Sequence, residues 1–157
     1  MKISILGAGN AGITLSGHLA MLGHEVYLYE DSLFEKNIQK IKDDFVIELI
    51  GEIKGKGKII KASTNMEEII RQAEIIFIAV PANYRSKFFE ELIKYIKCGQ
   101  FIILMPDNYS SFILYEKLKE RKIRKDIKAE ERISLKDLKE LIDALSKLNT
   151  NIQLIVL

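Results

Sequence analysis

The first thirty residues constrain the fold more than any other stretch of the chain. A short apolar run, Ile3–Leu6, leads into a G-x-G-x-x-G motif at residues 7–12, and apolar residues then recur at helical spacing as far as Leu22. A second strand-like run, Glu25–Tyr29, is followed by Glu30. The order strand, glycine turn, helix, strand and acid is the context in which this glycine motif predicts a dinucleotide site.

Glycine is needed at three positions of the motif for three different reasons. Gly7 lets the chain turn off the strand, Gly9 leaves room for a pyrophosphate beside the backbone, and Gly12 lets the helix pack closely on the sheet. The free N–H groups at the start of the helix, together with its dipole, favour a phosphate there. The Glu30 carboxylate can accept hydrogen bonds from the ribose hydroxyls. A glycine-rich turn that binds nothing is the alternative interpretation.

Composition limits the classes of partner. The chain has 157 residues, of which 48% are hydrophobic and 29% charged, which is typical of one globular domain with its own core. The net charge of +2 is too small to favour nucleic acid. The basic residues between 117 and 125 are interleaved with acids and lack clustered aromatic residues, so they predict a solvated helix end.

The single cysteine, Cys98, excludes an internal disulfide and a multi-cysteine metal site, and we expect no metal. No apolar run approaches the roughly 18 residues that a membrane span needs. The N-terminal residues form a strand and a glycine turn and lack the layout of a signal peptide. We therefore expect a cytoplasmic protein with no membrane or nucleic-acid partner.

A β-hairpin is predicted after the first β-α-β unit. Ser32 and Glu35 form a capping-box pattern that opens a helix. Strands are then expected at residues 45–50 and 58–62, around a turn at 51–57. The lysines of that turn favour a solvated hairpin tip, with contact to phosphates as the alternative.

Strands and helices alternate through the next part of the chain. A capping box of Thr64 and Glu67 opens a helix, and the apolar runs Ile75–Val80 and Phe101–Met105, each ended by proline, are typical of parallel strands covered on both faces. Helices are expected at residues 84–97 and 110–120, the second capped by Asp107-Asn108.

The alternation of strands and helices predicts an α/β fold with a doubly wound, Rossmann-type, mostly parallel sheet carrying one inserted hairpin. Right-handed crossovers bring the carboxyl ends of the strands to one edge, where ligands bind. The Gly7 turn, Glu30, Val80-Pro81 and Met105-Pro106 should therefore converge.

The C-terminal part is harder to assign. We expect a dinucleotide-binding domain at residues 1–130, with a short strand at 126–129, and a C-terminal helix and apolar tail at 131–157. The helix starts at Ser134, and the tail at 152–157 needs cover, as a strand or against a partner. This pattern predicts a homodimer.

From residue 1 to about 130 the chain resembles the N-terminal domain of the opine (octopine-type) dehydrogenases. The resemblance rests on Gly-Ala-Gly-Asn at 7–10, Gly-His-Glu-Val at 23–26, Gly-Lys-Gly-Lys at 55–58, Val-Pro-Ala at 80–82 and the pieces around residues 99–106 and 126–130. Ketopantoate reductases and glycerol-3-phosphate dehydrogenases are similar at this level. The run Asp-Asn-Tyr-Ser-Ser at 107–111 departs from the glycine-rich pattern of many relatives.

The resemblance implies an NAD(P)H-dependent reductive condensation of an amino acid with a 2-keto acid. It places the pyrophosphate on the glycine motif, the ribose on Glu30 and the cofactor path along Val-Pro-Ala. The expected cofactor-binding residues are Gly7, Ala8, Gly9, Asn10, Ala11, Gly12, Glu30, Val80, Pro81 and Ala82. After Glu130 the resemblance fades, and the family's helical domain, with its catalytic histidine and substrate pocket, has no counterpart.

No catalytic residue is predicted. Hydride transfer needs a substrate site and usually an acid–base group, most often histidine. His18 lies within the first helix and His24 in the loop after it, away from the ligand edge, and Asp107, Asn108 and Tyr109 are better explained as a helix cap. The sequence favours a domain that depends on a second polypeptide or an intersubunit site for its substrate.

Glu30 and Asp31 place two carboxylates near the ribose 2′ position, which favours NAD(H) over NADP(H), although Lys36 can soften the effect. Two alternatives stay open. One is a nucleotide-sensing regulatory module, like the ligand-gating domains of potassium transport systems, and the other is a remnant that binds no ligand.

Overall fold

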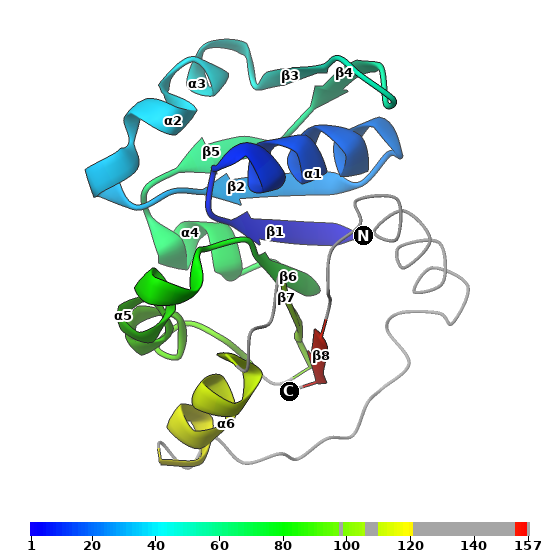
Figure 1. Cartoon of the computed structure of the whole chain (residues 1–157). Coiled ribbons are helices and arrows are strands. Elements are labelled where there is room, and N and C mark those ends of the chain that lie inside the picture. The colour runs from blue at the N-terminus through cyan, green and yellow to red at the C-terminus, as the bar shows by residue number, and fades with distance from the viewer. Residues whose placement is uncertain (98, 106–109, 121–152, 157) are drawn as a thin grey trace.

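The main element of the fold is a six-stranded sheet (Figure 1). The computed structural model describes residues 1–97, 99–105, 110–120 and 153–156. The strand order is β5-β2-β1-β6-β7-β8; the first five strands are parallel, and β8 runs antiparallel to β7. The strands are β1 (Lys2–Leu6), β2 (Glu25–Tyr29), β5 (Lys61–Ser63), β6 (Ile75–Ile78), β7 (Phe101–Leu104) and β8 (Gln153–Val156). The predicted doubly wound, mostly parallel class is confirmed.

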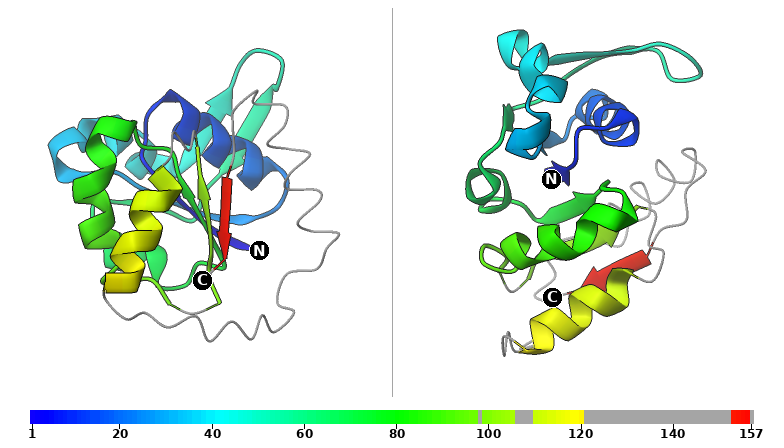
Figure 2. Two further views of the ribbon diagram at one scale, coloured as in Figure 1. Left: turned by 60° about the horizontal axis from the view of Figure 1, so that its bottom comes forward. Right: turned by 60° about the vertical axis from the view of Figure 1, so that its left-hand side comes forward.

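Helices cover both faces of this sheet (Figure 2). The helix α1 (Asn10–Met21) lies on one face, while α4 (Met66–Ile70), α5 (Ala82–Leu92) and α6 (Ser110–Glu120) lie on the other. Three short helical turns follow β2 and lead toward the hairpin: η1 (Ser32–Phe34), α2 (Lys36–Gln39) and α3 (Ile41–Asp44). The helix predicted at 84–97 begins two residues earlier and ends at Leu92.

The apolar strands are buried because each side chain meets a covered face. In β6, Ile75 and Phe77 pack in the cluster that includes Leu15 of α1, and Ile76 and Ile78 pack in the opposite cluster. All four β6 side chains are fully buried. This arrangement explains why the strand shows no polar alternation, as expected for a parallel strand between two helical layers.

The inserted hairpin packs on α1. It consists of β3 (Val46–Leu49) and β4 (Gly55–Lys58), paired antiparallel. The predicted hairpin is confirmed, but its second strand begins inside the predicted turn, and Lys61–Ser63 belongs to the main sheet. Glycine makes this possible, because a Cβ atom at Gly57 would lie 2.1 Å from the carbonyl oxygen of Gly17 in α1.

In both predicted capping boxes, the residue that caps the helix in the structure is the neighbour of the predicted one. Asp31 caps η1 by accepting a hydrogen bond from the Leu33 N–H at 2.9 Å, in place of the predicted Ser32–Glu35 pair. Asn65 caps α4 by accepting from the Glu68 N–H at 3.2 Å, in place of Thr64 with Glu67. Several neighbouring residues in each stretch are able to cap, so the pattern alone did not select the residue that does so.

The end of the tail forms a strand. β8 pairs with β7, so the strand alternative for the apolar tail is confirmed for residues 153–156. The predicted strand at 126–129 and C-terminal helix from Ser134, the Asp107-Asn108 cap and Cys98 lie outside the described residues. Where α6 is concerned, the predicted range 110–120 agrees with the structure.

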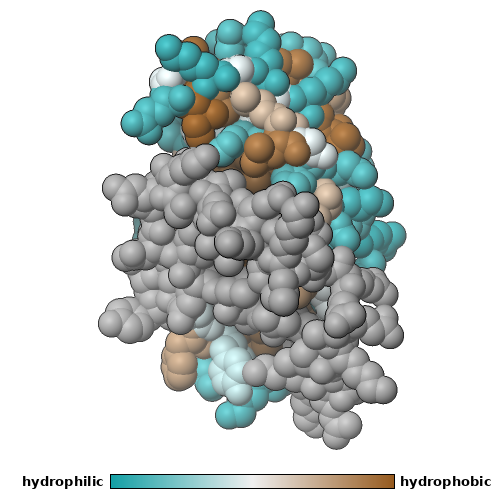
Figure 3. Space-filling view, turned by 90° about the vertical axis from the view of Figure 1, so that its right-hand side faces the viewer, coloured by the Kyte–Doolittle hydropathy of each residue, from teal (hydrophilic) through white to brown (hydrophobic). Residues whose placement is uncertain are grey.

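The surface in Figure 3 shows hydrophilic residues interspersed with separate hydrophobic ones over its coloured upper part. Within the described ranges, no helix is both long and apolar enough to cross a membrane.

The approach of the hairpin to α1 gives a first prediction. Gly57→Ala should lower the free energy of unfolding by about 1–3 kcal/mol, because the new methyl group overlaps the Gly17 carbonyl and forces the hairpin away from the helix. Urea denaturation measures the change. Lys58→Ala, at an exposed position of the same strand, is the control and should stay within about 0.5 kcal/mol of the parent. Equal stabilities of the Gly57 variant and the parent would contradict this packing.

Candidate functional site

The glycine turn joins the ends of three parallel strands. The Gly7 N–H donates to the Tyr29 carbonyl of β2 at 2.9 Å, and a Cβ atom at Gly7 would lie 2.8 Å from the Ala79 carbonyl oxygen after β6. Gly7 also has a φ of +105°, which side chains rarely adopt. A Cβ atom at Gly12 would lie 1.8 Å from the Gly7 carbonyl oxygen. Close packing within the protein therefore requires glycine at both positions.

Gly9 differs from these two glycines. A Cβ atom at Gly9 would meet no protein atom within 4 Å, and its φ of −75° suits any residue. The first N–H of α1 to bond back along the chain is that of Ile13, which donates to the Gly9 carbonyl at 2.9 Å. The N–H groups of Asn10, Ala11 and Gly12 precede that bond and lie at the positive end of the helix dipole. Open space beside these donors fits a phosphate group.

Glu30 is a buried carboxylate held by three donors. Its Oε2 accepts from the Ala8 N–H at 3.1 Å and from the Asn37 side-chain amide at 3.0 Å, and its Oε1 accepts from the Asp31 N–H at 3.0 Å. Only 8% of Glu30 is exposed. These bonds join the glycine turn, the end of β2 and α2, so Glu30 fixes the geometry of the loop as well as facing the cavity.

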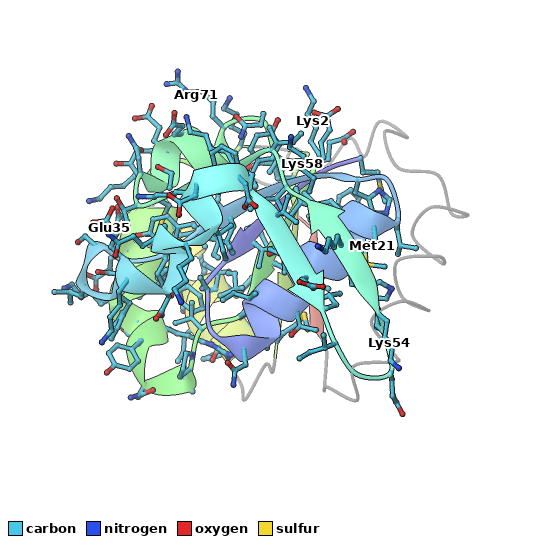
Figure 4. The ribbon with its side chains drawn as sticks, turned by 90° about the horizontal axis from the view of Figure 1, so that it is seen from above. Lys2, Met21, Glu35, Lys54, Lys58 and Arg71 are labelled. Atoms are coloured by element: carbon cyan, nitrogen blue, oxygen red, sulfur yellow. The ribbon has the colours of Figure 1, made fainter. Side chains whose placement is uncertain are left out.

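A cavity of about 610 Å³ lies over these groups. Of the predicted residues, Gly7, Gly9, Asn10, Ala11, Glu30, Val80 and Pro81 line it, whereas Ala8, Gly12 and Ala82 do not. Met105 also lines it, so the four strand ends expected to converge do so. The hairpin lysines do not contribute, and Lys54 points outward at the tip (Figure 4).

The sequence reading missed most of the apolar wall. Phe34 after β2 and Tyr84 of α5 meet edge to face, with ring centroids 5.9 Å apart and planes at 86°. Phe88, which also lines the cavity, makes a second edge-to-face pair at 5.6 Å with Tyr29, which lies behind the lining. Both pairs bring η1 or β2 against α5, and their residues are far apart in the sequence, so no local pattern indicated them. The further lining residues are Asp31, Leu33, Asn37, Ala79, Lys87 and Glu91.

The charges lining the cavity are mainly negative. Glu30, Asp31 and Glu91 contribute carboxylates, and Lys87 contributes one ammonium group. Lys36, which the sequence offered as a cation near the ribose, is not among the lining residues. A ligand group that carries extra negative charge would therefore be repelled by these carboxylates.

Arg85 braces the edge of the sheet next to the cavity. Arg85 is only 1% exposed, and its guanidinium donates to the Val80 carbonyl at 2.7 Å, to the Ser110 hydroxyl at 2.8 Å and to the Met105 carbonyl at 3.3 Å. One side chain thus ties the ends of β6 and β7 to the start of α6. These bonds connect the segments that form the walls beyond the glycine turn.

The residues considered for acid–base catalysis lie apart from the cavity or outside the described part. His18 is in the last turn of α1, His24 follows that helix, and neither lines the cavity. Asp107, Asn108 and Tyr109 are not described. Among the described residues no group of three or more histidine, cysteine, aspartate or glutamate side chains is placed to hold a metal ion.

Comparison with known proteins agrees with this geometry. A protein-family model described as the NAD-dependent glycerol-3-phosphate dehydrogenase N-terminus matches residues 2–106. The chain belongs to this family. It is an NAD-binding Rossmann-type domain related to the N-terminal domains of dehydrogenases, including the opine dehydrogenases that the sequence resembled.

Two curated relatives show the extent of the similarity of this family member. A glycerol-3-phosphate dehydrogenase [NAD(P)+] of Treponema denticola is 33% identical over 100 residues, covering 60% of the chain and 26% of the relative. An opine dehydrogenase of Arthrobacter sp. is 26% identical over 116 residues, covering 73% of the chain and 32% of the relative. The chain thus spans about a quarter to a third of these relatives.

A solved structure of octopine dehydrogenase in complex with NADH and agmatine has a TM-score of 0.53 and 22% sequence identity. The match covers 68% of this chain and 28% of that one. At this identity the similarity supports the fold.

The buried phenol of Tyr29 gives a second prediction. Burial, and after it the carboxylates of Glu91, Asp31 and Glu30, raise the pKa of Tyr29 above its ordinary value of 10.0. The unfolded chain ionises first on the alkaline side, so this contribution to stability is complete below about pH 10 and is lost as the pH rises toward the folded pKa. Tyr29→Phe should reduce the loss of stability above pH 10, as measured by thermal melting at pH 8–11. Exposed Tyr115→Phe is the control. Identical alkaline profiles for Tyr29→Phe and the parent would refute this assignment.

Proposed function

We propose that the chain is the NAD(H)-binding domain of an opine-dehydrogenase-like oxidoreductase. The observation that carries this proposal is one cavity with the open side of Gly9 and the buried carboxylate of Glu30 in its lining. A dinucleotide needs both features in one place, a backbone approach for the pyrophosphate and an acceptor for the ribose diol.

The cofactor would run along the edge of the sheet. The pyrophosphate lies on Gly9, Asn10 and Ala11, and the adenosine ribose on Glu30. Phe34 and Tyr84 offer an apolar wall for the adenine. The segment Val80–Ala82 leads toward the nicotinamide, and the Arg85 bonds to Val80 and Met105 hold that segment in place. Ala8 and Gly12 act indirectly, through Glu30 and through the packing of α1.

The bound cofactor supplies hydride transfer, and the domain supplies position and charge. The substrate site would lie outside the described residues of this domain, and the resemblance points to condensation of an amino acid with a 2-keto acid. The site of action is the cytoplasm. The pairing of β8 with β7 weakens one reason for the homodimer, since this part of the tail is engaged within the chain.

A nucleotide-sensing module without redox chemistry is the second candidate. It is favoured by the lining of the described cavity, which contains carboxylates and one lysine but no histidine. Oxidation of NADH by the chain together with a separate substrate domain would decide for the enzyme, and binding without turnover in any such pairing would decide for the sensor.

A Gly9→Ala variant tests the proposed site. The methyl group meets no protein atom, so the melting temperature should not fall. It occupies the space proposed for the pyrophosphate, and one overpacked methyl group costs about 1–3 kcal/mol, or roughly 5- to 150-fold in Kd. Isothermal calorimetry with NADH measures the loss. Unchanged affinity in the variant, or no binding by the parent, would refute the site.

The choice of cofactor gives a further prediction. NADH should bind more tightly than NADPH, because a 2′-phosphate adds charge beside Glu30 and Asp31. Asp31→Asn removes one carboxylate and should narrow the difference in Kd between the two cofactors, in titrations at low and high salt. Tighter binding of NADPH by the parent protein would show the prediction to be wrong.

A further inference from the structure

The Glu30 carboxylate has less free capacity for a ribose than the sequence motif suggests. A carboxylate offers about four acceptor positions, two on each oxygen. Oε2 already accepts from the Ala8 N–H and the Asn37 amide, and Oε1 accepts from the Asp31 N–H. One position remains, on Oε1, whereas a ribose diol brings two hydroxyl donors.

The three existing donors differ in their freedom to move. The Ala8 N–H belongs to a residue that is 2% exposed, so breaking its bond leaves a buried donor unsatisfied, at a cost of about 1–3 kcal/mol. The Asp31 N–H is in the next peptide group along the chain and is fixed relative to the carboxylate. The Asn37 amide is on an exposed side chain that lines the cavity. Unlike the two backbone N–H groups, this amide also carries an acceptor, its oxygen, which is free to face a ligand while the nitrogen donates to Glu30.

The backbone nevertheless holds Asn37 close to Glu30. Asp31 closes the turn after β2 by accepting from the Leu33 and Phe34 N–H groups at 2.9 and 2.8 Å. Ile38, the residue after Asn37, is fully buried and anchors α2 in the core. The short helix is therefore fixed on one side while the Asn37 side chain faces the cavity on the other.

We propose that Asn37 is a second ribose-recognition residue and that it determines, together with Glu30, the selectivity for an intact 2′,3′-diol. One hydroxyl donates to the open position on Oε1, and the other donates to the Asn37 amide oxygen while the amide nitrogen keeps its bond to Oε2. An amide can do both, since it carries a donor and an acceptor. This assignment rests on the proposed nucleotide site and extends it to a residue outside the sequence motif.

The experiment uses ADP, 2′-deoxy-ADP and 3′-deoxy-ADP as probes, with the full chain and calorimetric titration. Asn37→Ala should weaken ADP binding about 5- to 10-fold, the range of one hydrogen bond to a ligand. For the probe that lacks the hydroxyl read by Asn37, the same substitution should change Kd by less than about twofold, because the contact is already missing.

Gln39→Ala is the matched control, because Gln39 is an exposed residue of the same short helix and does not line the cavity. It should leave all three Kd values and the melting temperature unchanged, whereas Asn37→Ala removes a donor from the buried Glu30 carboxylate and should lower the melting temperature modestly. Asn37→Asp replaces the amide donor by a carboxylate facing Glu30 and should weaken ADP binding more than Asn37→Ala does.

The outcomes separate this inference from the proposed function. If the parent binds neither ADP nor NADH, the nucleotide site itself is wrong. If the parent binds both, and Asn37→Ala has no effect or weakens all three probes equally, Asn37 does not read the ribose and only the present inference fails. A loss confined to ligands that carry one particular hydroxyl supports it.

Discussion

The close approach of α1 to the turn that precedes it is the constraint on which the site depends. A Cβ atom at Gly12 would lie only 1.8 Å from the Gly7 carbonyl oxygen, so the helix can pack this closely on the turn only if residue 12 is glycine. This contact aims the first N–H groups of α1 along the edge of the sheet. It also brings Gly7 against the Tyr29 and Ala79 carbonyls, so the ends of β1, β2 and β6 are fixed relative to one another. The place that we propose for a phosphate thus follows from packing within the protein itself.

Glu30 connects the glycine turn to the end of β2 and to α2 through its hydrogen bonds. An acid at the end of the second strand is usually considered for its contact with a ribose, yet here its carboxylate is also a structural acceptor. The bond from the Ala8 N–H holds the middle of the glycine turn, and the bond from Asn37 holds α2 against the strand end. A buried charge is stable only when such donors surround it. The residue that we propose as the ribose ligand is therefore also the one that holds the walls of the cavity together.

The sequence predicted the parts of the fold that depend on local pattern. The runs around β1, β6 and β7 were found because strands covered on both faces are largely apolar, and α1 was found because its apolar residues recur with helical spacing. The helix caps were missed by one residue because Asp31-Ser32 and Ser63-Thr64-Asn65 each offer adjacent residues able to cap. The start of β4 was read as turn because its glycines are typical of loops, whereas Gly57 serves to let a strand cross α1 beside Gly17.

The walls of the cavity depend on tertiary contacts, and this is why the sequence did not reveal them. Phe34 and Tyr84 come from η1 and α5 and meet only after the crossover has placed α5 beside the end of β2. Arg85 has no motif around it, and its role appears only when the Val80 and Met105 carbonyls lie within reach of one guanidinium. The glycine motif indicates only that a dinucleotide can approach the backbone of the turn. We propose that residues such as Asn37 and Glu91, which line the cavity and which no such motif contains, decide which sugar and which charge it accepts. Selectivity in this domain is therefore a property of the elements that surround the motif, and it can change while the glycine turn stays the same.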